Sequence, residues 1–330
     1  MRLAGETVVV TGAGGFIGSH LAESLVRCGA KVRAVVHYNS RQDLGNLALV
    51  EPDVRRAMEV RALDVADPFS VRSVVEDAAC VFHLAALIGI PYSYVAPASY
   101  VETNVRGTLN VLEAARLCRT PRVVHTSTSE VYGTAVYAPI DENHPLQAQS
   151  PYSASKIAAD KLAESYARSF ELPVSVLRPF NTFGPRQSER AVIPTIIAQL
   201  LRGNRPIALG SLDPVRDFTF VSDTARAFVA VAESDATIGL VCNAGHGKGI
   251  SVGDLASKVA QLLGVNVEIQ HEPGRVRPRD SEVGQLICDA GRLRQLTGWI
   301  PEVSLQQGLE QVLAYMRNNL RPVGAEAYVI

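Results

Sequence analysis

Tyr152 and Lys156 are the residues whose types and spacing point most directly to chemistry. Ser150 and Pro151 precede them in the order that favours a helix N-cap and a first helical turn, so we expect a helix to begin here. Four residues make about one turn, and the two side chains therefore leave the same face. A nearby ammonium favours the ionised form of a phenol, whose pKa is ordinarily ~10. The pair could thus remove a proton from a hydroxyl group at neutral pH.

A glycine-rich turn at residues 11–18 predicts a dinucleotide site upstream of this pair. The turn follows a short apolar run and leads into an amphipathic stretch, which is the strand-turn-helix context that such a site needs. Gly12 permits a tight turn, Gly15 lets a pyrophosphate approach the backbone, and Gly18 lets the helix and strand pack closely. The N-terminus of the helix would then face the anion.

The end of the second predicted strand leaves the choice between NAD and NADP open. An acidic residue that accepts the adenosine ribose hydroxyls is expected there, yet residues 35–41 contain none. His37 and Arg41 could face the 2′-phosphate of NADP, or they could be solvated loop residues. Asp64, at the end of the next strand, either accepts from the adenine amino group or caps the end of its strand.

The strands and helices that must position these residues are visible as alternating apolar and amphipathic stretches. The predicted strands are residues 7–10, 31–37, 57–65, 79–84, 122–126, 174–178 and 240–243, and the predicted helices are residues 16–28, 68–77, 98–117, 151–170 and 223–232. This alternation predicts an α/β fold, a Rossmann-type doubly wound parallel sheet. Proline-rich loops after residue 178 predict a smaller interleaved C-terminal substrate domain. We expect residues 1–177 and 212–243 to form the dinucleotide domain, and residues 178–211 and 244–330 the substrate domain.

Composition restricts the classes of partner. The 32 lysines and arginines nearly balance the 33 aspartates and glutamates, so no overall field attracts nucleic acid or anionic lipid. No run of about 18 apolar residues occurs, which argues against a membrane span. The five cysteines lie far apart without metal-ligand spacing. We therefore expect a cytoplasmic protein with reduced cysteines, no metal and a small-molecule substrate.

Several short motifs, in order along the chain, resemble those of the extended short-chain dehydrogenase/reductase family, in its NAD-dependent nucleotide-sugar epimerase/dehydratase branch. They are the glycine turn, residues 83–86, residues 104–108, Tyr152 with Lys156, residues 178–181, 184–186 and 216–218, Arg277-Pro278 with Asp280, and residues 298–301. The resemblance covers nearly the whole chain. Residues 88–101, 126–133 and 179–195 are most similar to bacterial 4,6-dehydratases of legionaminic-acid-type pathways.

The resemblance implies a reaction on a nucleotide sugar. Thr128 would hydrogen-bond the sugar 4-hydroxyl while Tyr152 removes its proton, and a hydride leaves C4 for the nicotinamide. Glu130 would then abstract the acidified C5 proton, the 6-hydroxyl would leave as water, and the hydride would return to C6. NAD would stay tightly bound and be recycled within each turnover. The leading expectation is a 4,6-dehydratase acting on a UDP- or GDP-linked hexose, with N-acetylglucosamine as a candidate sugar.

Ser129 departs from the pattern of many dehydratases, which place an aspartate there to protonate the departing hydroxyl. A Thr-Ser-Glu sequence occurs in the GDP-mannose dehydratase subgroup, but Ser-Glu also occurs in UDP-glucuronate decarboxylases. A 4-epimerase needs only Thr128, Tyr152 and the cofactor, and its relatives usually lack a carboxylate at the position of Glu130. The 4-epimerase and the decarboxylase therefore remain alternatives, although residues 87–93 offer no cation for a substrate carboxylate. A dinucleotide sensor without chemistry would have no use for Tyr152.

The resemblance also implies which residues bind. The dinucleotide is expected against Gly12, Gly15, Phe16, Ile17, His37, Asp64, Val65, Leu84, Ala85, Ala86, Asn104, Tyr152 and Lys156. The nucleotide sugar is expected against Ile88, Asn181, Val192, Arg216 and Arg277, the two arginines binding its diphosphate through paired N–H groups. Arg186 and Arg279 are weaker candidates. The helices predicted at residues 98–117 and 151–170 would form a homodimer through a four-helix interface, or pack within one subunit instead.

Overall fold

The fold is organised around a seven-stranded parallel sheet in a computed structural model that describes residues 1–275 and 278–320. The strand order is β11-β6-β5-β4-β1-β2-β3, and all neighbours are parallel. The strands are β1 (Thr7–Thr11), β2 (Lys31–His37), β3 (Glu59–Leu63), β4 (Cys80–His83), β5 (Val123–Thr126), β6 (Val174–Pro179) and β11 (Val241–Ala244). The order reverses between β1 and β4, where ligands bind in such sheets. The predicted doubly wound parallel sheet is confirmed.

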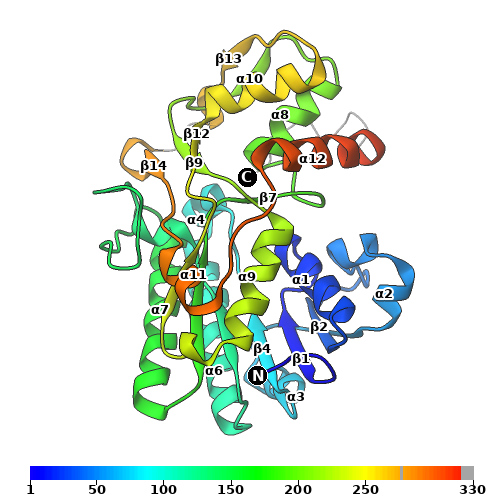
Figure 1. Cartoon of the computed structure of the whole chain (residues 1–330), viewed down its shortest axis with the longest axis vertical. Helices are drawn as coiled ribbons and strands as arrows, with labels where there is room; N and C mark the ends of the chain where they lie inside the picture. Colours follow the sequence, from blue (N-terminus) through cyan, green and yellow to red (C-terminus); the bar gives the residue numbers. More distant parts are fainter. Residues whose placement is uncertain (276–277, 321–330) are drawn as a thin grey trace.

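Helices cover both faces of this sheet (Figure 1). Because successive strand residues point to opposite faces, Val8 and Val10 enter the core under α1, α9 and α11, while Val9 enters the core under α3, α6 and α7. The helices of this unit are α1 (Phe16–Arg27), α2 (Pro52–Arg56), α3 (Pro68–Val75), α4 (Ile90–Val95), α5 (Pro97–Tyr100), α6 (Gly107–Leu117), α7 (Pro151–Phe170), α9 (Val221–Glu233) and α11 (Gly291–Thr297). Short 3₁₀ turns occupy Gly45–Leu49, Ser129–Tyr132 and Asp235–Thr237.

The helix predicted at residues 98–117 is interrupted. It consists of α5, π-helical turns over Val101–Arg106, and α6. Apolar spacing cannot distinguish a π-helical turn from an α-helical one, since both keep a similar stripe over one or two turns. The strand predicted at residues 57–65 is also shorter, at Glu59–Leu63.

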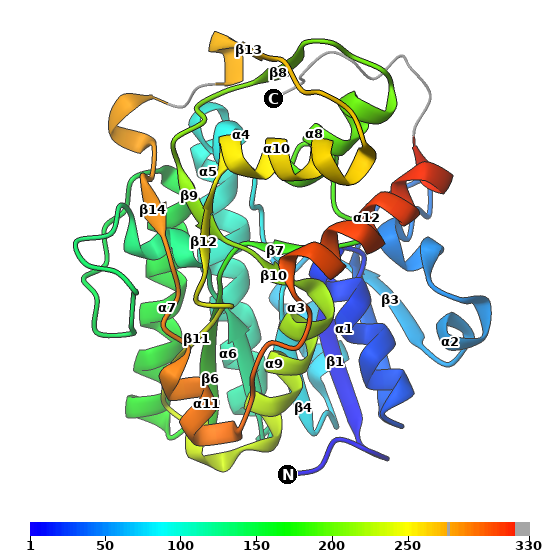
Figure 2. The same ribbon diagram turned by 45° about the horizontal axis from the view of Figure 1, so that its top comes forward.

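A smaller unit lies over the carboxyl ends of the strands (Figure 2). It contains α8 (Val192–Leu201), α10 (Val252–Leu263), α12 (Leu305–Asn319), β7 (Thr182–Phe183), β8 (Ile207–Leu209), β9 (Val215–Asp217), β10 (Thr219–Phe220), β12 (Gly249–Ser251), β13 (Ile269–His271), β14 (Gln285–Leu286) and 3₁₀ turns at Pro273–Arg275 and Arg279–Ser281. Its core joins Ile196, Leu255 and Leu309. Strand β9 pairs with β12 and β14 rather than with the large sheet, so the predicted boundary at residue 212 falls too early.

The described residues can be compared with three expectations from composition, which concern membrane spans, metal ions and cysteines. Within the described ranges, every helix is too short or too polar to cross a bilayer. The described residues also bring together no group of three or more His, Cys, Asp and Glu side chains that could hold a metal ion. All five cysteines are free, and Cys80, Cys242 and Cys288 are buried.

Candidate active site

The glycine turn joins β1 to α1 at the point where the strand order reverses. Gly15 is the N-cap of α1, and no side chain caps the first-turn N–H groups of Phe16 and Ile17. A Cβ on Gly18 would lie 2.2 Å from the Gly12 carbonyl oxygen, so only glycine allows α1 to pack this closely. A Cβ on Gly15 would meet only the Gly12 oxygen, at 3.1 Å. This exposed, uncapped helix end fits the pyrophosphate of a dinucleotide.

Gly12→Ala should weaken dinucleotide binding. The backbone has φ +72°, and an added Cβ would lie 2.7 Å from the Ala85 nitrogen. Forcing a left-handed alanine costs about 1–3 kcal/mol, which corresponds to roughly 5- to 150-fold in affinity. NADH fluorescence titration measures the loss. Gly253→Ala is the matched control because its nearest neighbour atom would be 3.7 Å away, and NADH binding as tight in Gly12→Ala as in this control would contradict the assignment.

The loop after β4 forms the opposite wall of the turn. The Thr11 hydroxyl accepts hydrogen bonds from the Leu84 and Ala85 N–H groups, both at 3.1 Å, which fixes the segment that continues to Ala86. Asn104 is buried, and its side chain binds both backbone groups of Leu87 and the Ser155 hydroxyl at 2.8–3.0 Å. Asn104 therefore holds this wall against α7 rather than presenting a free amide to a cofactor.

The residues expected around the adenosine lie at the ends of β2 and β3. His37 is exposed at the end of β2. The Asp64 carboxylate accepts from the Ala66 N–H at 2.9 Å, which is the strand-end cap that the sequence left as an alternative. Val65 is buried against Gly107 of α6, where an added Cβ would come within 2.8 Å of it. The structure thus fixes the backbone at the ends of these two strands.

The catalytic candidates meet where β5 ends and α7 begins. The Thr128 hydroxyl accepts from the Glu130 N–H at 3.2 Å and also hydrogen-bonds the Tyr152 phenol. Glu130 is half-buried and lies close enough for its charge to act on that phenol. Ser129, in contrast, is only 3% exposed and lies within the 3₁₀ turn. Thr128, Glu130 and Tyr152 therefore form one cluster.

The titration of this cluster differs from the sequence expectation. Burial raises the pKa of Tyr152, and repulsion from Glu130 adds to that effect, while the Thr128 hydrogen bond opposes it. Burial lowers the pKa of Lys156 to about 8, and its ammonium donates to the Thr126 carbonyl at 2.6 Å. The sequence predicted a lowered phenol pKa because it considered the neighbouring charge but not the desolvation.

Asp160 forms a buried polar network beneath Lys156 that the sequence analysis missed. Its Oδ2 accepts from the Arg178 guanidinium at 2.8 and 3.0 Å and from the Ser127 hydroxyl at 2.8 Å. Burial alone would raise the pKa of Asp160, but hydrogen bonding by His125 and the charge of Arg178 lower it to about 2. The position is four residues after Lys156, on the same face of α7, and that spacing was the available signal.

Asp160→Asn should destabilise the fold, because Arg178 would keep a buried charge without a carboxylate. Both side chains are at most 2% exposed, and breaking such a pair costs about 3–5 kcal/mol. Urea unfolding measures the loss. Lys161→Gln, on the same helix, removes a pair whose lysine is 56% exposed and should leave stability unchanged. Equal stability of the two variants would contradict the network.

The loop expected to line the sugar approaches Tyr152 from the other side. Ile90 and Tyr100 pack with Tyr152 in one small apolar cluster, and the rings of Tyr100 and Tyr152 are 6.3 Å apart. The Tyr100 hydroxyl donates to the Gly89 carbonyl at 2.5 Å. Ile88, at the tip of the loop, is 69% exposed. Tyr100 was not identified from the sequence, because its contacts with Gly89 and Tyr152 join separate segments of the chain.

The residues expected to bind the rest of the nucleotide sugar differ in their burial and in their hydrogen-bond partners. Asn181 has a buried side-chain oxygen without a hydrogen-bond partner, which suits an amide meant for a ligand. Val192 begins α8 and is partly buried in the core of the small unit. Arg216 is 7% exposed and its guanidinium lies 3.5 Å from Glu282. Arg277 lies outside the described residues.

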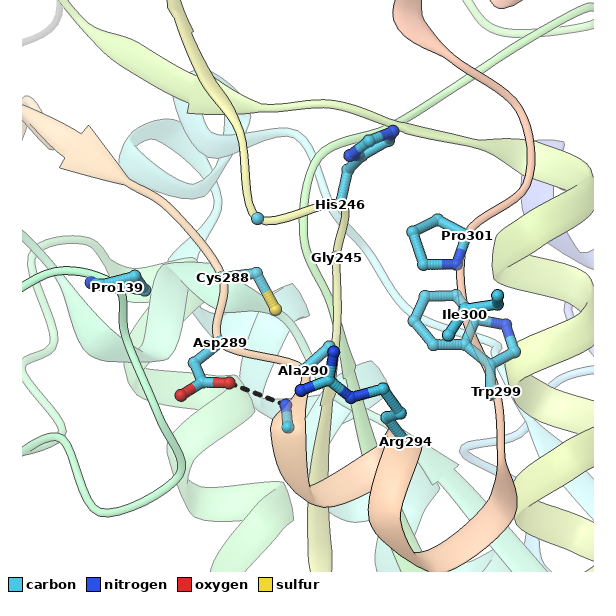
Figure 3. Close-up of a pocket in the computed structure, with 12 residues that line it drawn as sticks. Pro139, Gly245, His246, Cys288, Asp289, Ala290, Arg294, Trp299, Ile300 and Pro301 are labelled. Atoms are coloured by element: carbon cyan, nitrogen blue, oxygen red, sulfur yellow. Dashed lines mark hydrogen bonds between the residues drawn. The ribbon is translucent and has the colours of Figure 1, made fainter.

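A hollow of about 320 Å³ opens beyond the end of β11, lined by His246, Arg294, Trp299 and neighbours (Figure 3). None of its lining residues is a sequence-predicted site residue. Its loops are held by the buried Asp217 carboxylate, which accepts from the His246, Gly247 and Cys288 N–H groups at 2.7–3.1 Å. Because Asp217 follows Arg216 in β9, these bonds also fix the strand that carries Arg216.

Comparisons with known proteins place this geometry among nucleotide-sugar enzymes. Residues 9–312 match the family model of GDP-mannose 4,6 dehydratase. A putative UDP-glucose 4-epimerase of Methanocaldococcus jannaschii is 31% identical over 95% of this chain and 99% of its own. A UDP-N-acetyl-alpha-D-glucosaminuronate decarboxylase of Bacillus cytotoxicus is 30% identical over 94% of this chain and 97% of its own. The structure of the dTDP-glucose 4,6-dehydratase DesIV of Streptomyces venezuelae, with NAD bound, aligns with a TM-score of 0.83 and 28% identity over 95% of this chain and 97% of its own.

Proposed function

This chain belongs to the GDP-mannose 4,6-dehydratase-like family of NAD-dependent nucleotide-sugar enzymes, and we propose that within it the chain is a 4,6-dehydratase for a UDP- or GDP-linked hexose. The observation that carries the proposal is the cluster of Thr128, Glu130 and Tyr152. Glu130 provides, besides the Tyr152 phenol, a second group that can accept a proton. Among the three candidate reactions, only the elimination requires two such groups.

The residues divide the reaction between them. When a dinucleotide is bound with its pyrophosphate at the glycine turn, its nicotinamide supplies an acceptor and donor of hydride. Thr128 positions the sugar 4-hydroxyl and Tyr152 takes its proton, with Lys156 holding a positive charge nearby. Glu130 removes the C5 proton once C4 is a ketone, and the 6-hydroxyl leaves as water. Ser129 lies buried within the 3₁₀ turn beside Glu130, and the proton for that hydroxyl is assigned to Glu130 or to water.

A 4-epimerase is the second candidate, favoured by the epimerase among the relatives. Thr128 and Tyr152 suffice for it, because the 4-keto sugar only has to turn over before it is reduced. Glu130 would then have no proton to move. A decarboxylase, favoured by another relative, would need a cation for the uronate, which residues 87–93 do not provide.

Mass spectrometry of the product, combined with proton NMR of any nucleotide sugar of unchanged mass, separates the three reactions. Purified protein with NAD would be incubated with UDP- and GDP-N-acetylglucosamine, UDP-glucose and UDP-glucuronate. A dehydratase yields a nucleotide sugar lighter by one water. A product of unchanged mass with inverted C4 would identify the epimerase, and a loss of carbon dioxide from the uronate would identify the decarboxylase.

NAD is the cofactor proposed here, retained through turnover because the hydride taken from C4 returns to C6. The relative DesIV binds NAD. The absence of an acid at residues 35–41 leaves NADP as the alternative. Nucleotide released from heat-denatured protein would be identified by chromatography: NAD supports the proposal, NADP replaces it, and neither contradicts tight retention.

We also propose a homodimer through α6 and α7. These helices lie side by side on one face of the sheet and leave Leu109, Leu117 and Phe170 38–52% exposed. Burying apolar side chains against a second copy would form the expected four-helix interface. Light scattering should give twice the chain mass, and a monomer at micromolar concentration would contradict the proposal.

A further inference from the structure

The Gly184-Pro185-Arg186 motif has no role in the reaction proposed above, although it lies between two expected substrate contacts. Asn181 precedes it and Val192 follows it, at the start of α8. We call residues 184–191, which connect β7 to α8, the substrate loop. Its position connects one ligand site to the other.

Arg186 binds the substrate loop to the helix of the dinucleotide turn. Its Nη2 donates to Glu23 Oε2 at 2.6 Å and to His20 Nδ1 at 2.9 Å. His20 Nε2 in turn donates to the Pro185 carbonyl at 2.9 Å. These bonds require a neutral imidazole, and burial together with the charge of Arg186 lowers the pKa of His20 to about 4. We call His20, Glu23 and Arg186 the α1 clasp.

The clasp occupies the same face of α1 as the residue that opens the helix. Phe16, His20 and Glu23 are four and three residues apart, so they form one stripe. The rings of Phe16 and His20 meet edge to face at 5.8 Å, and a Cβ on Gly184 would lie 3.6 Å from the Phe16 ring. Figure 2 shows the parallel pair β7 and β10 near this end of α1. The stripe therefore runs from the glycine turn to the substrate loop.

A second connection reaches the same loop from the glycine turn itself. The Asn46 N–H donates to the Gly14 carbonyl at 2.8 Å, and its side chain donates to the Arg186 carbonyl at 3.0 Å. The glycine turn is thus connected to the Arg186 side chain through α1 and to the Arg186 backbone through Asn46.

The far end of the substrate loop is fastened to α8. The Thr195 hydroxyl donates to the Glu189 carbonyl at 2.6 Å, and Arg202 pairs with the Glu189 carboxylate at 2.9 Å. The loop therefore joins the dinucleotide turn at one end to the helix that begins at Val192 at the other.

We propose that the α1 clasp transmits dinucleotide binding to the substrate loop, so that each ligand strengthens the binding of the other. His20, Glu23 and Arg186 act as positioning residues. The coupling to substrate rests on the nucleotide-sugar site proposed above, whereas the ordering of the loop by the dinucleotide does not. Coupling between two binding sites is necessarily reciprocal, and commonly amounts to about 5–150-fold in affinity.

A second arginine paired with Glu23 provides the control for the clasp. Its Oε2 faces Arg186, whose side chain is 9% exposed, and its Oε1 faces Arg27 of the same helix at 3.0 Å, whose side chain is 52% exposed. Arg27 does not contact the substrate loop. Arg27→Gln therefore removes a charge from Glu23 without opening the clasp.

The test measures binding and exchange rather than turnover. The affinities of UDP and of GDP would be determined by calorimetry on protein freed of retained nucleotide, with and without added NAD, for the parent chain, R186Q, E23Q, the double variant and R27Q. Amide hydrogen exchange of residues 184–191 would be followed with and without NAD in the same proteins. Thermal unfolding confirms that each variant is folded.

The clasp predicts that NAD tightens binding of the preferred diphosphate by about tenfold in the parent and in R27Q, and by less than about threefold in R186Q and E23Q. The double variant should lose no more of this coupling than R186Q does, because both substitutions remove the same contact. NAD should slow exchange of the loop in the parent and R27Q only. Unchanged coupling and protection in folded R186Q would overturn the clasp. If neither diphosphate binds the parent, the nucleotide-sugar proposal fails, while loop exchange still decides the clasp.

Discussion

Replacing Glu130 with glutamine should abolish formation of the dehydrated sugar, lowering its rate by about 10³-fold, within the range of roughly 10²–10⁴ attributed to a positioned general base. The amide has nearly the shape of the carboxylate but cannot accept the C5 proton. The Thr128 hydrogen bond to the Glu130 backbone does not involve the side chain and should persist. The product rate is measured by mass spectrometry.

The same variant should retain oxidation at C4, because Thr128, Tyr152 and Lys156 are untouched. Quenching the E130Q reaction with borodeuteride should therefore place deuterium at C4 of a sugar that still carries its 6-hydroxyl. E102Q, at an exposed carboxylate on the same unit, is the control and should behave as the parent. An E130Q protein that still produces dehydrated sugar at the parent rate would remove Glu130 from the mechanism, and one that inverts C4 efficiently would identify an epimerase.

Tyr152→Phe should remove nearly all turnover, by about 10²–10⁴-fold in kcat, because no other group contacts the 4-hydroxyl as a base. The ring is 7% exposed within the cluster of Ile90 and Tyr100, and phenylalanine keeps that packing. The KM should therefore change little. Since burial raises the pKa of the phenol, kcat of the parent should rise toward alkaline pH, and Y152F should lose this limb of the profile.

Tyr137→Phe is the control for this substitution, because Tyr137 is 44% exposed and lies on the loop before α7. Steady-state rates across pH, with protein folding checked by circular dichroism, decide the outcome. Activity in Y152F within about threefold of Y137F would exclude Tyr152 as the base.

The parts of the site that depend on local sequence could be predicted. The glycine turn and the start of α7 each follow from a contiguous pattern, and in the structure Gly12 follows β1, Thr128 follows β5 and Tyr152 lies in the first turn of α7. The helix predicted over residues 98–117 lies where it was expected, but it is interrupted. Apolar spacing does not reveal the π-helical turns around Asn104.

The parts that depend on contacts between distant segments could not be predicted. Asp160 on α7 contacts Arg178 on β6, and Tyr100, which is bonded to Gly89, packs against Tyr152. Arg186 was considered as a phosphate ligand, because the sequence of the motif does not show which group its guanidinium binds. Its pairing with Glu23, 163 residues away, required the fold.

Proton NMR of the product formed in deuterated water from UDP- and GDP-N-acetylglucosamine tests the central claim most directly. A 4,6-dehydratase should give a 4-keto sugar with a 6-methyl group and with deuterium introduced from solvent at C5, where the base acts. A sugar inverted at C4 that keeps its 6-hydroxyl and its C5 proton would contradict the dehydratase and leave the epimerase in its place.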